Sequence, residues 1–141
     1  MYRFIKSPSC ALLVAAMMAI SVRSASAENV MVNLTGGEET PPVTTAASGT
    51  GTIKVTESKS VSGTIRTARI FGSMAHMHVG APGQSGPPIV ALIKVAEDMW
   101  SVPPGFRFTD EQYASFKAGD VYVNIQSPWH KAGEIRAQLK P

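Results

Sequence analysis

Short runs of alternating apolar and polar residues recur along the chain from Val30 onward, separated by glycine, proline, serine and threonine. A period of two is typical of strands that bury one face, and many short strands between turn residues indicate a sandwich or barrel. The pattern therefore predicts an all-β fold, an antiparallel, Greek-key-like β-sandwich or barrel with one short helix. The expected strands are 30–34, 50–56, 60–67, 68–79, 89–95, 121–125 and 135–139.

The one expected helix begins after Thr109, a favourable N-cap, and Gln112 completes a capping box with it. The two acidic residues that follow Thr109 suit the positive end of the helix dipole, and Gly119 is a typical stop. Tyr113 and Phe116 lie three residues apart, so we expect both on the helix face that packs against the sheet. We also expect three aromatic residues to anchor the crossing before the helix: Trp100, Phe106 and Phe108.

The N-terminus has the pattern of a secretory signal peptide. A basic head with Arg3 and Lys6 precedes an apolar run at 10–22, and Ala25-Ser26-Ala27 is a small-x-small cleavage site. The apolar run is shorter than the roughly 20 residues that a membrane-spanning helix needs. We therefore expect 1–27 to be a signal peptide and 28–141 to be one periplasmic or secreted domain with no membrane contact after cleavage.

Removal of this signal peptide changes the charge. The full sequence has 13 Lys and Arg residues against 10 Asp and Glu, and three of the basic residues precede Glu28. The remaining domain is neutral overall and lacks the basic footprint of a nucleic-acid-binding protein, so we expect no nucleic-acid partner. The only cysteine, Cys10, lies in the signal peptide, and the domain must be stable without a disulfide.

The segment Met74–Val79 contains two of the three histidines. Residues i and i+2 of a strand project from the same face about 7 Å apart, so His76 and His78 can converge on one bound atom. Met74 shares their face, whereas the alternate residues of this segment are apolar and face the core. The spacing makes this strand a candidate metal clamp outside the core.

His130 lies in the segment that joins the last two expected strands, and it can supply a third nitrogen if those strands neighbour the histidine strand. Three nitrogens with one soft thioether favour copper, whereas three nitrogens and a water suit zinc. We therefore predict a copper site formed by His76, His78, His130 and Met74, with zinc as the alternative ion. A lone His-x-His is equally compatible with surface histidines that bind no metal.

Polar residues near this strand are candidates for orienting the imidazoles. Asn124, Gln126 and Glu134 can each accept the second ring proton of a histidine. The Gly/Pro-rich segment 80–88 follows the second histidine directly, and it is either a wide turn or a lid beside the histidines. For Glu134 and Arg136 we expect a structural role, in mutual pairing or in pairing with adjacent strands.

Four ordered blocks carry a family resemblance. They are AHMHVGAPG with GPPIV in 75–90, the helix start after Thr109, VYVNI at 121–125 and GEIRAQL at 133–139. Together they resemble the CHRD domain, which is named after repeats in the extracellular growth-factor antagonist chordin and also occurs in microbial exported proteins. The resemblance covers nearly all of 28–141 and implies an all-β extracellular module with no generally established enzymatic activity. Where the family often has a histidine after the VYVNI strand, this chain has Gln126.

The His-x-His strand is also similar to one element of the copper-zinc superoxide dismutases. Those enzymes need more imidazoles than three and a structural disulfide, so we do not expect dismutase activity. The sequence has neither a phosphate-loop lysine nor a serine-nucleophile signature, and we predict no catalytic residue. Two functions stay open, a metal-binding exported module and a metal-free extracellular module for protein interaction or adhesion.

Overall fold

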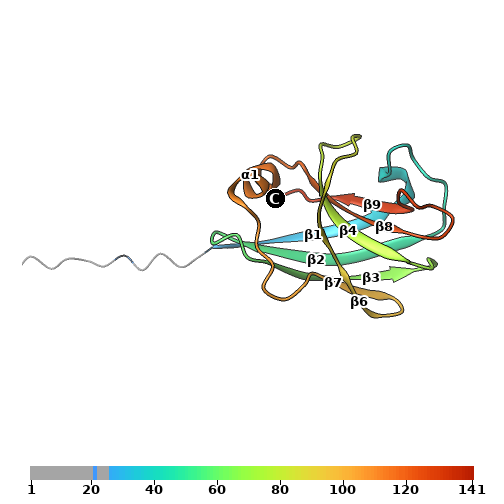
Figure 1. Ribbon diagram of the computed structural model, residues 1–141, viewed down its shortest axis with the longest axis horizontal. Helices are drawn as coiled ribbons and strands as arrows, with labels where there is room; N and C mark the ends of the chain where they lie inside the picture. Colours follow the sequence, from blue (N-terminus) through green and yellow to red (C-terminus); the bar gives the residue numbers. More distant parts are fainter. Residues whose placement is uncertain (1–20, 22–25) are drawn as a thin grey trace, which may run out of the picture.

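The computed structural model describes Ser21 and residues 26–141 (Figure 1). Most of the expected signal peptide lies outside the described residues, and cleavage after Ala27 stays a prediction. The described chain contains strands β1 (Ala27–Thr35), β2 (Ser48–Thr56), β3 (Val61–Ala68), β4 (Met74–Val79), β5 (Pro88–Ala91), β6 (Ile93–Ala96), β7 (Met99–Ser101), β8 (Val121–Gln126) and β9 (Ile135–Gln138), with helix α1 (Asp110–Lys117) and a 3-10 turn at Gly36–Glu38.

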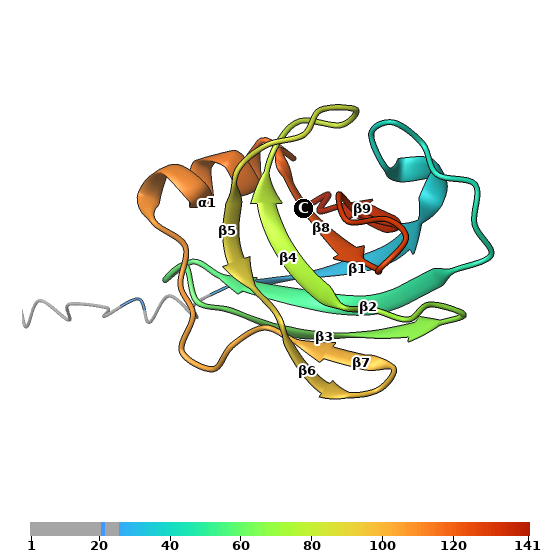
Figure 2. The same ribbon diagram turned by 45° about the vertical axis from the view of Figure 1, so that its right-hand side comes forward.

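These strands form one antiparallel sheet in the order β5-β4-β8-β9-β1-β2-β3-β7-β6. The two edge strands, β5 and β6, are consecutive in the chain and only Leu92 separates them. The backbone N–H of Leu92 donates to the carbonyl of Ala75 at 2.9 Å, and its side chain is buried. One bent stretch of chain therefore brings the two edges of the curled sheet together (Figure 2). The expected all-β fold is confirmed as a nearly closed barrel with one short helix.

Alternate residues of the strands fill the barrel. On β1 the buried residues are Val30, Val32 and Leu34, and the residues between them are exposed. Phe116 of α1 is fully buried, and Tyr113 packs against the core from the same helix. The expected anchors also lie in or against this core: Trp100 and Phe108 are buried, and Phe106 is partly buried. The capping box at Thr109 and Gln112 is confirmed, and Gly119 follows the helix with φ 81°.

The expected strand 68–79 is wrong in its first half. Strand β3 continues to Ala68, the chain then turns, and β4 begins only at Met74. Arg69 has φ 57°, a left-handed conformation that breaks the extended backbone. Gly72 lies so close to the core that an added Cβ would be 2.9 Å from the ring of Trp100. The expected strand 89–95 is likewise divided at Leu92, and the short strand β7 was not foreseen.

Candidate functional site

The outward side of β4, β8 and β9 carries a ladder of polar side chains, which we call the polar face. Its members are Met74, His76 and His78 of β4, Tyr122, Asn124 and Gln126 of β8, and Arg136 and Gln138 of β9 with the preceding Glu134. The strand register aligns them, because His76 is opposite Asn124, which in turn is opposite Arg136. The inward neighbours Ala75 and Met77 are buried in the core. The expected placement of the histidines outside the core is confirmed.

Each of the two histidines on the polar face has its Nδ1 beside a carbonyl oxygen. Nδ1 of His76 lies 3.2 Å from Oε1 of Gln126, and Nδ1 of His78 lies 3.0 Å from the backbone oxygen of Gly86. An oxygen acceptor at Nδ1 favours the tautomer that is protonated there and leaves the lone pair on Nε2. In His78 this tautomer places the lone pair against Oδ1 of Asn124. The two rings lie 5.8 Å apart, edge to face.

His78 is the more constrained of the pair. Its Nε2 lies 3.0 Å from Oδ1 of Asn124, and its ring stacks on Tyr122 with a centroid distance of 4.7 Å. Burial lowers the pKa of His78, and the hydrogen bonds to Gly86 and Asn124 only partly offset this. The neutral imidazole, which is the form that binds metals, is therefore favoured at neutral pH. The expectation that Asn124 and Gln126 contact histidines is confirmed.

The Gly/Pro-rich loop 80–87 lies beside these histidines, and buried side chains of the polar face fix it. Arg136, only 1% exposed, donates to the carbonyls of Gln84 at 2.8 Å and Ala81 at 3.1 Å. Gln138 donates to the carbonyl of Gly80 at 2.7 Å. The guanidinium of Arg136 also lies 3.5 Å from the centre of the Tyr122 ring. The loop is therefore held by its backbone carbonyls rather than by its side chains.

The expected mutual pairing of Arg136 with Glu134 is wrong, whereas the expected structural contact with an adjacent strand is confirmed by the Tyr122 ring of β8. The ion pairs among the described residues do not include Arg136, which bonds to loop carbonyls and to Oε1 of Gln138. Glu134 instead accepts a hydrogen bond from Ser127 Oγ at 3.2 Å. We expected the outward side of this strand to face solvent, where an arginine is not buried. The loop covers that side instead, and its carbonyls satisfy the buried guanidinium.

His130 does not join the other two histidines. The backbone hydrogen bonds between Ser127 and His130 form a tight turn, and Nε2 of His130 faces Oε1 of Glu134 at 3.7 Å. Across 26–141 no group of three or more His, Cys, Asp and Glu side chains is arranged to hold a metal ion. Met74 does lie on the same side of β4 as His76, and it is 53% exposed.

Glu39 is a residue that the sequence did not single out. It is 7% exposed, and burial raises its pKa to about 7 although the nearby charge of Arg136 and a hydrogen bond from Asn124 act in the opposite direction. Its Oε1 is buried without a hydrogen-bond partner. A Cβ at Gly133 would lie 2.3 Å from this oxygen, so only glycine allows the approach. No periodic pattern marks Glu39, because it lies in the connection after β1.

The polar face is built largely from three of the sequence blocks noted above, those within 75–90, 121–125 and 133–139. A match to the CHRD domain family covers residues 30–139, nearly all of the described barrel. The chain belongs to the CHRD family. CHRD domains occur in extracellular or secreted proteins, and membership supports a binding module of some kind. No curated protein and no solved structure matches the chain. None of the helices in the described part is long and apolar enough to cross a membrane.

Proposed function

We propose that this CHRD domain is an exported binding module that holds one copper ion between Nε2 of His76 and Nε2 of His78. The observation that supports the proposal is the carbonyl oxygen beside each Nδ1. Histidine ligands of metals commonly donate the other ring N–H to a carbonyl or carboxylate, which fixes the ring and the tautomer. In this chain Gln126 and Gly86 supply those acceptors.

The donor set favours copper over harder ions. Two imidazoles lie beside the exposed thioether of Met74 on one side of β4. Nitrogen and thioether ligands suit copper, and Cu(I) in particular, whereas zinc usually requires three protein ligands and a water. His130 is not part of the proposed site, because its turn directs it towards Glu134.

Two features of the polar face weaken copper binding. Oδ1 of Asn124 contacts Nε2 of His78, and this contact must break before the nitrogen can bind the metal. The positive charge of Arg136 acts on His78, as its effect on the pKa of the histidine indicates. Copper competes with protons for the imidazoles, and the lowered pKa of His78 keeps its ring neutral below the ordinary histidine pKa of about 6.5. We therefore expect binding to fall only as the pH drops below about 6.5.

The test is a titration of copper into exported, tag-free protein, monitored separately under reducing conditions for Cu(I) and oxidising conditions for Cu(II). We expect one ion per chain, a large loss of affinity in His76→Ala and His78→Ala, and a weaker effect of Met74→Leu that is confined to Cu(I). His130→Ala is the matched control and should bind like the parent. Equal, weak binding by the parent and the double variant His76→Ala/His78→Ala would instead support the metal-free interaction module.

Export itself can be checked on the same material. Mass spectrometry of protein recovered outside the cytoplasm should give a chain that begins at Glu28, because the small-x-small site ends at Ala27. A mature chain that retains Cys10 would contradict both the predicted cleavage and the proposed location.

A further inference from the structure

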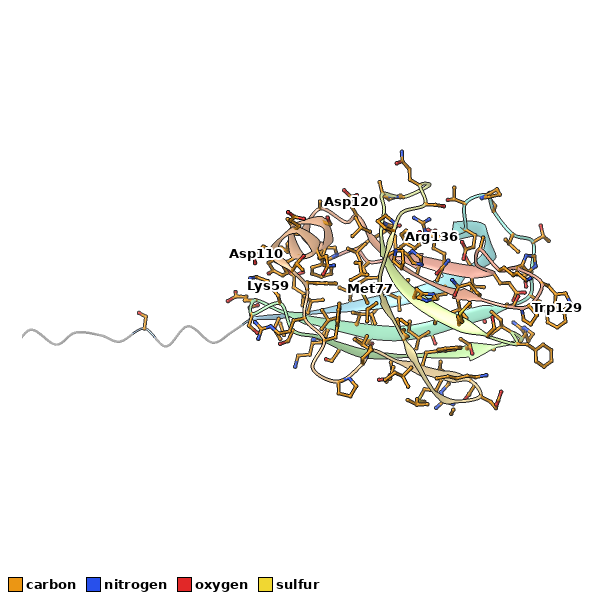
Figure 3. The ribbon with its side chains drawn as sticks, in the orientation of Figure 1. Lys59, Met77, Asp110, Asp120, Trp129 and Arg136 are labelled. Carbon is orange, nitrogen blue, oxygen red and sulfur yellow. The ribbon has the colours of Figure 1, made fainter. Side chains whose placement is uncertain are left out.

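Two loops at one end of the barrel each expose a large aromatic side chain. Phe71, in the loop between β3 and β4, is 76% exposed, and Trp129, in the loop between β8 and β9, is 70% exposed. Their rings meet edge to face with centroids 5.8 Å apart. We call this pair the aromatic tip. Figure 3 shows Trp129 at the end of the barrel opposite Asp110 of helix α1.

The loops that carry the tip are fixed from below. The backbone N–H of Ser73 donates to the carbonyl of Gln126 at 2.9 Å and ties the two loops together. Gly72, next to Phe71, packs against the ring of Trp100 in the core. Ser127 is 1% exposed, and its hydroxyl accepts a hydrogen bond from the N–H of His130. Because the backbone of these loops is already ordered, binding of a partner to the two rings costs little conformational entropy of the loops.

The surroundings of the tip are basic and hollowed. The segments 69–73 and 127–133 contain Arg69 and Lys131 and no Asp or Glu. A hollow of about 230 Å³ lies between segment 39–43 and segment 130–133, which follows Trp129 directly in the sequence. Segment 39–43 contains two exposed prolines. The one acidic residue of this hollow, Glu39, is buried and its raised pKa weakens its charge near neutral pH. At the same end of the barrel, Lys94 donates to the carbonyl of Gly72, and the carboxylates of Glu97 and Asp98 are paired with Lys94 and Arg66. Arg69 and Lys131 therefore leave an excess of positive charge near the rings.

We propose that the aromatic tip is a docking surface for an acidic polypeptide segment, in which an apolar side chain of the partner covers Phe71 and Trp129 and its carboxylates lie against Lys131 and Arg69. Aromatic residues and arginine are enriched at protein interfaces, and tryptophan and arginine are common among the residues that contribute most to the binding energy. The hollow beside the tip gives a peptide side chain a place to enter, which a flat lipid surface would not use. This surface is separate from the copper ligands, so its test does not depend on the proposed metal.

The experiment is a selection of random peptides displayed on phage against the exported, tag-free protein, with a chelator present. Enriched peptides are then synthesised with a fluorescent label, and affinities are measured by anisotropy. We expect acidic peptides that contain apolar residues, and at least about a tenfold weaker affinity in Phe71→Ala and in Trp129→Ala. Lys131→Glu should also weaken binding, as should raising the salt from about 0.1 M to about 1 M, which shortens the Debye length from about 10 Å to about 3 Å.

The control variant is Met31→Ala, which removes an apolar side chain that is 72% exposed on β1 and should leave the affinity unchanged. Unlabelled peptide should shift the emission of the parent to shorter wavelength, because Trp129 is exposed while Trp100 is only 2% exposed. Failure to enrich peptides, enrichment without acidic residues, or affinities that the tip variants do not change would each overturn the proposal. Binding of the tip to vesicles that contain anionic phosphatidylglycerol, with no peptide enriched, would overturn it in favour of a lipid surface.

Discussion

The polar face and the aromatic tip are neighbouring regions of the same strands and loops, yet they use their side chains in opposite ways. On the polar face, Arg136 and Gln138 direct their hydrogen bonds to the chain's own loop. At the tip, Phe71 and Trp129 leave most of their surface in solvent. Polar groups that are paired inside the protein stabilise the fold, whereas exposed apolar groups contribute little to it. Substitutions on the polar face should therefore lower the free energy of unfolding, whereas substitutions at the tip should lower binding.

The largest expected effect is on the polar face, in Arg136→Ala. The variant removes the donor for the carbonyls of Ala81 and Gln84 and the cation over the Tyr122 ring. Leaving buried acceptors unpaired costs about 1–3 kcal/mol for each group, so we expect the free energy of unfolding to fall by about 3 kcal/mol or more. Urea denaturation measures this directly. Arg66→Ala, which breaks an exposed ion pair with Asp98, is the control and should cost less than about 1 kcal/mol.

The next prediction concerns the pH dependence that Glu39 imposes. Its pKa is about 7 in the folded protein against 4.5 in the unfolded chain, so the folded state holds the proton more tightly between these values. Stability should therefore be highest with Glu39 protonated and should fall as the pH rises from about 4.5 through about 7, by about 3 kcal/mol in total.

Glu39→Gln keeps a neutral side chain of the same shape and should remove this decline, so the variant should be more stable than the parent at pH 8. Denaturation curves at a series of pH values test the prediction, with the exposed Glu38→Gln as the control. A decline that persists unchanged in Glu39→Gln would assign the pH dependence to another group.

How far the sequence predicts the molecule depends on the range of the interactions involved. Period-two patterning and capping chemistry are local, and they predicted the β fold, the helix from Thr109 and the outward histidines. The same alternation brought Asn124 and Gln126 to the histidines. The predictions that failed depend on contacts between residues far apart in the sequence or on the path of a loop. The burial of Arg136 requires the loop 80–87 to fold over β9, and the position of His130 is decided by a turn whose partners no sequence pattern indicates.

The two histidines of β4 should also differ in how much each contributes to the free energy of unfolding. His78→Ala removes a ring stack on Tyr122 and the one hydrogen bond that a neutral imidazole can donate to Gly86 or Asn124, and we expect it to cost about 1–2 kcal/mol. His76→Ala removes a single hydrogen bond to Gln126 and should cost less than about 1 kcal/mol. Denaturation without metal measures this difference, whereas both variants should lose copper. Equal destabilisation would mean that the loop contact of His78 adds nothing to the fold.

The smallest expected effect on stability is at the tip. Phe71→Ala and Trp129→Ala remove side chains that are exposed on ordered loops. Exposed substitutions that break no cap, buried contact or hydrogen-bond network usually change the free energy of unfolding by less than about 0.5 kcal/mol. Trp100→Ala, which removes the buried tryptophan of β7, should cost about 3–5 kcal/mol and is the positive control in the same denaturation series. If the tip variants prove as destabilising as a core substitution, then Phe71 and Trp129 support the fold through each other and the loss of peptide binding would follow from unfolding. If they melt like the parent, any loss of affinity belongs to the surface itself, because the loops beneath the rings are held by Ser73 and Ser127 rather than by the rings.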